Sequence, residues 1–225
     1  MVVRPAKAGI ERIGAYMVDE VADDLPPPRI LLNSNESAFG PSPDAIGTAR
    51  QAAAHMERYF EDADAALAPR IASFFNLDAS RIVVGGGSDD LLSRIARIYL
   101  GPGDELLRSV NGYPKVPNYA HANDAEVCSV ADEDLRPSVA SLIAGINDRT
   151  KIVYLANPEN PAGTFLNGAE VRELHAAMPD DVLLVLDCAF EEYVDDPQYE
   201  PATTLVETAD NVVMSRTFSK IFGLA

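Results

Sequence analysis

One lysine near the end of this 225-residue chain stands where it could do chemistry. Lys220 lies in a hydroxyl-rich turn with Thr217 and Ser219, after a short apolar segment that begins at Asn211 and before the apolar Ile221. Apolar neighbours would partly remove water from the amine and lower its pKa, and such an amine can form a Schiff base with a carbonyl compound. A surface lysine that merely follows a buried strand would show the same local pattern.

A glycine turn earlier in the chain could bind an anion. We expect a strand at residues 81–84, then three glycines ending at Gly87, and then a helix that Ser88 opens. Free N–H groups and the helix dipole at this point would attract a phosphate. The pattern matches neither a dinucleotide-binding Gly-x-Gly-x-x-Gly nor a Walker loop. The alternative that this turn only caps the helix and supplies small residues for packing remains open. The buried face of the helix is predicted to contain Leu91, Leu92, Ile95 and Ile98.

Two polar side chains are expected at the carboxyl ends of buried strands. Asn160 lies in Asn-Pro-Glu-Asn-Pro-Ala-Gly-Thr, residues 157–164, directly after a predicted strand, and its prolines exclude a helix. Asp187 ends the apolar run of residues 181–186. Because ligands of α/β proteins bind at the carboxyl ends of strands, both are candidates for a binding site. A simple turn remains the alternative for Asn160.

The order of these features resembles the fold-type I pyridoxal-phosphate (PLP) aminotransferases, and most closely the histidinol-phosphate aminotransferase group. The resemblance covers residues from about 30 to the end: glycine turn, aromatic residue, Asn-Pro-x-Asn-Pro, strand-end Asp and Ser-x-x-Ser-Lys. The aromatic residue is Tyr113, in Val-Asn-Gly-Tyr-Pro where the family has Pro-Thr-Tyr. Asn35 stands in a segment similar to the family's Asn-Glu substrate segment. Tyr59 follows Arg58 as in the family's Arg-Tyr-Pro turn, with Phe60 in place of proline.

This resemblance implies a role for each residue. Lys220 would bind PLP as a Schiff base and act as general acid and base, while Asp187 would keep the pyridine nitrogen protonated. Tyr113 would stack on the ring. Asn160 would be the main protein donor to the phenolic oxygen, because Phe190 replaces the family's usual tyrosine. Asn35 would contact the substrate. In a homodimer, Tyr59 would contact the cofactor phosphate bound by the partner subunit. The residues that would bind the PLP phosphate are Gly87, Ser88, Asp89, Thr217 and Ser219.

The alternation of strands and helices predicts an α/β fold, which the resemblance refines to a three-layer α/β/α large domain with a mostly parallel sheet. Residues 1–30 are expected to form an N-terminal arm and linker, and residues 31–225 a PLP-binding large domain. That domain would be incomplete, since the family's next arginine and C-terminal small domain are absent from this sequence. The predicted strands are 104–108, 126–130, 151–156 and 181–186, and the predicted helices 43–57, 64–75, 137–146 and 167–177.

Composition narrows the classes of function. A net charge of −17 argues against nucleic acid as a partner. The chain has no bilayer-length apolar run and no signal-peptide core in its first twenty residues, so we expect a cytoplasmic protein without a membrane partner. The spacing of histidines and cysteines predicts no metal site. The acidic pairs Glu191-Glu192 and Asp195-Asp196 are expected to be solvated surface.

The expected function is amino-group transfer between an amino compound, such as histidinol phosphate or a related amino acid, and a 2-oxo acid. A PLP-dependent amino-acid phosphate decarboxylase of the same fold shares every motif and stays open. A non-catalytic, truncated cofactor-binding module also stays open, because the chain stops at Ala225. We expect these 225 residues alone to be poorly active.

Overall fold

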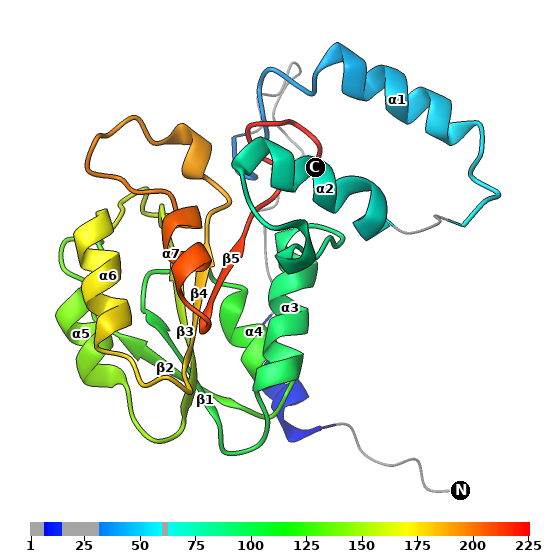
Figure 1. Ribbon diagram of the computed structural model, residues 1–225. Helices are drawn as coiled ribbons and strands as arrows, with labels where there is room; N and C mark the ends of the chain where they lie inside the picture. The colour runs from blue at the N-terminus through cyan, green and yellow to red at the C-terminus, as the bar shows by residue number, and fades with distance from the viewer. Residues whose placement is uncertain (1–6, 15–31, 60–62) are drawn as a thin grey trace, which may run out of the picture. The chain divides into compact units, whose positions relative to one another are not determined.

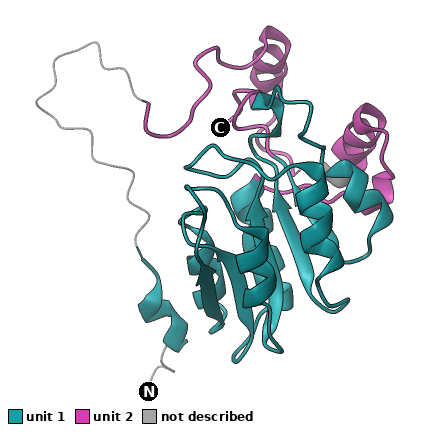
Figure 2. Ribbon diagram, turned by 90° about the vertical axis from the view of Figure 1, so that its left-hand side faces the viewer, with its two compact units in different colours: residues 1–14, 88–216 teal, residues 15–87, 217–225 magenta. Residues whose placement is uncertain are grey.

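The computed structural model describes residues 7–14, 32–59 and 63–225 (Figure 1). The chain divides into two compact units: unit 1 comprises residues 1–14 and 88–216, and unit 2 residues 15–87 and 217–225 (Figure 2). Most of the predicted arm and linker lies outside the described residues, as does Phe60. The boundary expected at residue 30 stays a prediction.

Within the described residues, unit 1 is built on a five-stranded parallel sheet of order β2-β1-β3-β4-β5. One row of paired residues, from Cys128 through Leu107, Val153 and Leu184 to Val212, runs across all the strands. Every residue of β1 and β4 is buried, as expected for a parallel sheet covered on both faces. The strands are β1 (Glu105–Ser109), β2 (Glu126–Val130), β3 (Thr150–Ala156), β4 (Leu183–Asp187) and β5 (Val212–Ser215).

Helices cover both faces of this sheet, which confirms the predicted three-layer fold (Figure 1). Successive strand residues point to opposite faces, so Leu184 packs with one helical layer and Val185 with the other. The first layer is α5 (Val139–Gly145), α6 (Gly168–Ala176) and α7 (Thr203–Thr208), and the second is α3 (Ser88–Tyr99) and α4 (Val116–His121).

Local signals set two helix starts in unit 1. Ser88 opens α3 as predicted. α6 begins after Asn167, whose Oδ1 accepts a hydrogen bond from the backbone N–H of Glu170 at 3.0 Å while Glu170 Oε2 accepts one from Asn167 N at 2.8 Å. The prediction for Ile98 was wrong, because its side chain is 74% exposed while Ala96, one turn after Leu92, is buried.

The N-terminal turn η1 (Ala8–Arg12) belongs to unit 1 and packs on α4. Gly9 N donates to Asp124 Oδ1 at 2.7 Å, and Arg12 pairs with Glu126 at 2.8 Å. A Cβ at Gly9 would lie 1.9 Å from the His121 carbonyl oxygen, so this close approach requires glycine.

Unit 2 contains α1 (Pro43–Ala53), α2 (Ala63–Phe75) and the turn η2 (Ala79–Arg81). Ser42 caps α1 as predicted, since its Oγ accepts from Ala45 N at 3.1 Å. α1 ends at Ala53, before the predicted residue 57, and buries none of its residues.

The predicted helix 64–75 is confirmed as α2, which runs from Ala63 to Phe75 and contains Pro69. The strand predicted at residues 81–84 was wrong. Ile82 has an extended backbone after the turn η2, but residues 82–85 are not part of the sheet that the described residues form. None of the helices in the described residues has the length and hydrophobicity that a membrane crossing requires.

Candidate functional site

Asp187 is a buried carboxylate at the carboxyl edge of the sheet. Its Oδ2 accepts a hydrogen bond from the Tyr154 hydroxyl at 2.8 Å. Its Oδ1 accepts from Ser215 Oγ at 3.0 Å and from Ala189 N at 3.3 Å. Burial raises the pKa of Asp187, while these three donors stabilise its charged form and oppose the rise. A buried carboxylate held in this way suits a cationic group on a ligand.

Neighbouring strands bring these groups together. Tyr154 lies in β3, Asp187 is the last residue of β4, and Ser215 is the last residue of β5. Asp187 and Ser215 are paired in the register of β4 and β5. Sequence reasoning named Asp187 and missed the role of Tyr154. The sequence did offer a signal for it, a tyrosine within a run of aliphatic strand residues. A buried tyrosine hydroxyl needs a hydrogen-bond partner, so such a tyrosine indicates a polar contact in the core.

Asp89, in the first turn of α3, fixes the tyrosine predicted to stack on a cofactor. Its Oδ1 accepts from the hydroxyls of Tyr113 at 3.1 Å and Tyr119 at 2.7 Å, and its Oδ2 pairs with Lys115 Nζ at 2.6 Å. Burial disfavours the charged form, but the bonds from Lys115 and the tyrosines outweigh it and lower the pKa of Asp89. Since these side chains occupy the carboxylate, only the backbone N–H of Asp89 suits the predicted phosphate contact.

A buried arginine holds the loop that carries Tyr113. Arg108 Nε donates to the carbonyl oxygen of Ser109 at 2.7 Å, and its two other nitrogens donate to the carbonyls of Gly112 at 2.5 Å and Tyr113 at 3.1 Å. A Cβ at Gly112 would lie 3.2 Å from both carboxylate oxygens of Glu159, which leaves little room for a side chain. This loop is therefore packed tightly against the segment that precedes Asn160.

The Asn-Pro-x-Asn-Pro segment follows β3 as predicted. Asn157 bonds through its side-chain amide to both backbone groups of Leu166, at 2.8 and 3.0 Å. Glu159 Oε1 accepts from Asn160 N at 3.1 Å, and burial raises the pKa of Glu159 to about 7. No described residue forms a hydrogen bond with the side-chain amide of Asn160, which leaves this donor available to a ligand.

The prediction that Glu191 and Glu192 are solvated was wrong. Both carboxylates pair with the guanidinium of Arg216, and their side chains are only 10% and 20% exposed. Burial lowers the pKa of Arg216, but the two carboxylates outweigh it and raise the pKa. Opposite charge thus allows the acidic pair to be buried. The second pair, Asp195 and Asp196, is exposed as expected.

In unit 2 the turn that carries Lys220 is organised by hydroxyl groups. Thr217 Oγ1 lies 2.9 Å from Ser219 Oγ and accepts from Ser219 N at 3.2 Å. Lys220 Nζ donates to the carbonyl oxygen of Ser34 at 3.3 Å, beside Asn35. The apolar Ile221 is exposed, so it removes little water from this turn.

Two other predicted site residues, Gly87 and Tyr59, also belong to unit 2. Gly87 has a φ of 96°, a conformation that suits glycine, and it directly precedes α3. Tyr59 is 100% exposed. Unit 1 therefore brings together Asp187 with Tyr154 and Ser215, and Asp89 with Tyr113. The roles assigned to the site residues stay predictions.

A parallel sheet between two helical layers, with polar groups at its carboxyl edge, defines a three-layer α/β/α domain. The chain belongs to the aminotransferase class I and II family, whose model matches residues 27–225. The predicted resemblance to the histidinol-phosphate aminotransferase group is confirmed by the relatives described next.

The chain is 45% identical over 216 residues to the histidinol-phosphate aminotransferase of Granulibacter bethesdensis, covering 96% of this chain and 58% of that protein. It is 43% identical to the histidinol-phosphate aminotransferase of Paramagnetospirillum magneticum, and the match covers 97% of this chain and 60% of that protein. The crystal structure of the Sinorhizobium meliloti histidinol-phosphate aminotransferase with pyridoxal-5'-phosphate superposes with a TM-score of 0.80 at 32% identity, covering 85% of this chain and 52% of that one. The chain thus spans less than two thirds of the length of these relatives.

Proposed function

We propose that this chain carries the cofactor-binding domain of a PLP-dependent aminotransferase, with histidinol phosphate or a related amino compound as donor and a 2-oxo acid as acceptor. The observation that carries the proposal is the buried, triply hydrogen-bonded carboxylate of Asp187 at the strand edge. When bound, PLP supplies a protonated ring that withdraws electrons from the substrate Cα. A charged carboxylate facing the ring nitrogen would keep that nitrogen protonated.

The other residues are assigned by their matched positions. Lys220 would hold the cofactor through its aldehyde and would serve as the general acid and base that moves a proton at the substrate Cα. Tyr113 stacks on the ring, and its tether to Asp89 supports this by fixing the phenol. Asn160 donates its side-chain amide to the phenolic oxygen.

The phosphate would be bound at the start of α3, a twelve-residue helix whose first N–H groups carry partial positive charge. This local field matters because the net charge of the chain, −17, opposes anions. The residues assigned to this contact are Gly87, Ser88, Asp89, Thr217 and Ser219.

We assign the protein to the cytoplasm as a homodimer, in which Tyr59 reaches the partner's cofactor phosphate and Asn35 contributes to the substrate site. The full exposure of Tyr59 and the 82% exposure of Met56 support a surface that a second subunit covers. Sedimentation equilibrium is expected to give the dimer mass. A monomer at micromolar concentration would contradict the assignment.

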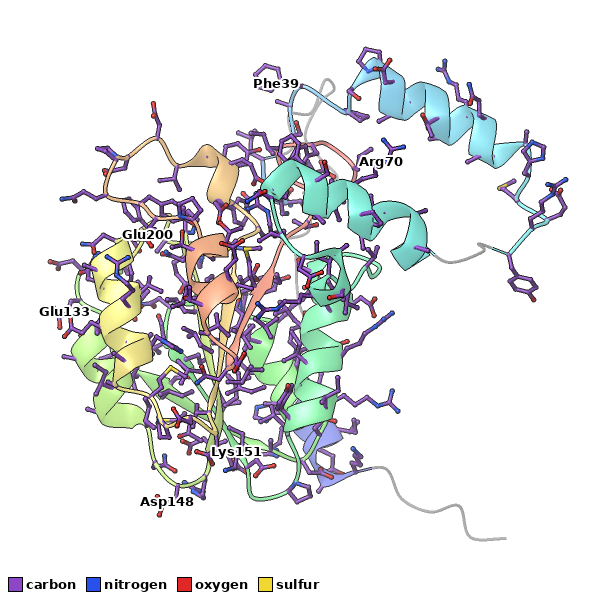
Figure 3. The ribbon with its side chains drawn as sticks, in the orientation of Figure 1. Phe39, Arg70, Glu133, Asp148, Lys151 and Glu200 are labelled. Atoms are coloured by element: carbon purple, nitrogen blue, oxygen red, sulfur yellow. The ribbon has the colours of Figure 1, made fainter. Side chains whose placement is uncertain are left out.

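The test of function is exchange of the substrate α-proton in D2O, followed by NMR with PLP-loaded protein and histidinol phosphate. Lys220→Ala is expected to abolish exchange, because no other group is assigned to move this proton. Lys151→Ala is the control, since Lys151 pairs with Asp181 at the start of β3 (labelled in Figure 3). Unchanged exchange in Lys220→Ala would remove the lysine from its role.

Product analysis separates the alternatives. Keto-product formation from histidinol phosphate supports aminotransfer, whereas carbon dioxide release from an amino-acid phosphate without keto product selects the decarboxylase. Bound PLP without any half-reaction selects the non-catalytic module.

A further inference from the structure

The Asp187 carboxylate is held by two neutral side chains that no predicted role uses. Tyr154, buried in β3, donates its hydroxyl to Oδ2 at 2.8 Å. Ser215, buried at the end of β5, donates to Oδ1 at 3.0 Å. We propose that Tyr154 and Ser215 are positioning residues that orient the Asp187 carboxylate and make the site select a ring with a basic nitrogen. This inference rests on the proposed function.

Three donors leave one lone-pair site of the Asp187 carboxylate without a hydrogen-bond partner among the described residues. An ionised carboxylate has about four lone-pair sites, and three are filled by Tyr154, Ser215 and the backbone N–H of Ala189. The donors come from β3, β5 and the segment after β4, so they fix the carboxylate from separate directions. A side chain with two free torsions is thereby restricted to one orientation.

The chemistry of the donors matters as much as their positions. Hydroxyl groups stabilise the negative charge of Asp187 without cancelling it, whereas a lysine or arginine would form an ion pair and compete with a cationic ligand. Three basic side chains of unit 1 bind other groups: Arg108 donates to backbone carbonyls, Lys115 pairs with Asp89, and Arg216 pairs with Glu191 and Glu192. The charge of Asp187 is therefore kept for a ligand.

The proposal separates two ligands that differ in one atom. PLP has a ring nitrogen that the Asp187 carboxylate can bind when protonated. Its 1-deaza analogue carries a C–H at that position and keeps the aldehyde and phosphate. If the hydroxyls act through Asp187, their removal weakens binding of PLP and leaves binding of the analogue unchanged.

The variants remove single hydroxyls. Tyr154→Phe keeps the ring in the core, and Ser215→Ala acts on the other carboxylate oxygen. Because a hydrogen bond to a charged group is lost, PLP affinity is expected to fall about 10-fold in Tyr154→Phe and by a smaller factor in Ser215→Ala.

Matched controls come from the same unit. Tyr199 donates its hydroxyl to Asn157 O at 2.9 Å and contacts Glu191, not Asp187. Ser138 is buried at the start of α5 and bonds to Glu133 at 2.7 Å. Tyr199→Phe and Ser138→Ala are expected to bind both ligands like the unmodified protein, because neither touches the carboxylate.

The experiment measures dissociation constants of PLP and the 1-deaza analogue by fluorescence for all five proteins, with circular dichroism as a check of folding. Selective loss of PLP affinity in Tyr154→Phe and Ser215→Ala supports the proposal. Equal weakening of both ligands, or of neither, overturns it. If Tyr154→Phe does not fold, Ser215→Ala carries the same test. Failure of the unmodified protein to bind PLP would instead overturn the proposed function, and with it this inference.

Discussion

Units 1 and 2 differ in how their polar and aromatic side chains are held. In unit 1, Asp187 and Arg108 are buried and each makes three or more hydrogen bonds to described groups. In unit 2, Tyr59 is fully exposed and Phe39 is 99% exposed, with its side chain standing clear of the ribbon in Figure 3. The sheet of unit 1 therefore fixes its polar groups by its own packing, while unit 2 relies on local caps and turns.

The helices repeat this contrast. α6 in unit 1 buries Gly168, Val171 and Leu174 against the sheet, whereas α1 in unit 2 buries none of its residues. Helices of this length gain most of their stability from packing of an apolar face. Unit 1 thus supplies a rigid frame for chemistry, and the exposed side chains of unit 2 suit contacts with other surfaces.

The largest expected effect separates the two units by core truncation. Leu184→Ala, at a fully buried position of β4, should lower the free energy of unfolding by about 3 kcal/mol because it leaves a cavity. Met56→Ala, next to α1, should change it by no more than about 0.5 kcal/mol. Urea unfolding measures both. Equal losses would break the contrast between the units.

A pH-dependent effect is expected next, because Glu159 is buried in unit 1 and its pKa is raised from 4.5 to about 7. Between about pH 4.5 and pH 7, Glu159 therefore keeps its proton in the folded chain and has lost it in the unfolded chain. The stability that this one group contributes is fully present below about pH 4.5 and is lost as the pH rises through about 7, with a size of up to about 3 kcal/mol. Glu159→Gln should remove this decline, since the amide oxygen can still accept from Asn160 N.

The control for this pH dependence is Glu57→Gln in unit 2, where the glutamate side chain is 64% exposed beside Arg58. Chemical unfolding at pH 5 and pH 8 compares the three proteins. Glu57→Gln should keep the decline in stability that the unmodified protein shows. An equally steep decline in Glu159→Gln would show that the buried carboxyl is not its source.

The smallest expected effect concerns helix caps. Asn167→Ala should destabilise the chain by about 1 kcal/mol, because it breaks the capping box of the packed helix α6. Ser42→Ala removes a similar bond, but α1 buries no residue. Its effect should therefore appear as faster local hydrogen exchange in α1 with little change in global unfolding. A global loss in Ser42→Ala as large as in Asn167→Ala would contradict this.

Local signals in the sequence predicted much of the fold. The continuous apolar run before Asp187 indicated a strand buried on both faces, and Ser42 marked a helix start correctly. Contacts between distant segments were the part that could not be predicted. Tyr154 meets Asp187 across 33 residues only because β3 and β4 are neighbours in register.

The wrong predictions have the same origin. The two glutamates at 191 and 192 looked like solvated surface because Arg216, which pairs with them, lies more than twenty residues away. Conversely, the predicted strand at residues 81–84 had the right apolar residues and Ile82 is extended, but this segment is not part of the sheet that the described residues form. Neither effect can be seen in the local hydrophobic pattern.

The central claim is that Lys220 bonds covalently to PLP. The direct measurement is borohydride reduction of the purified, PLP-loaded protein, followed by proteolysis and mass spectrometry of all lysine-containing peptides. The account predicts one stable pyridoxyl-phosphate adduct, on Lys220, and loss of the visible absorption band on reduction. Adducts on Lys115 or Lys151 with Lys220 unmodified, or no adduct at all, would contradict it.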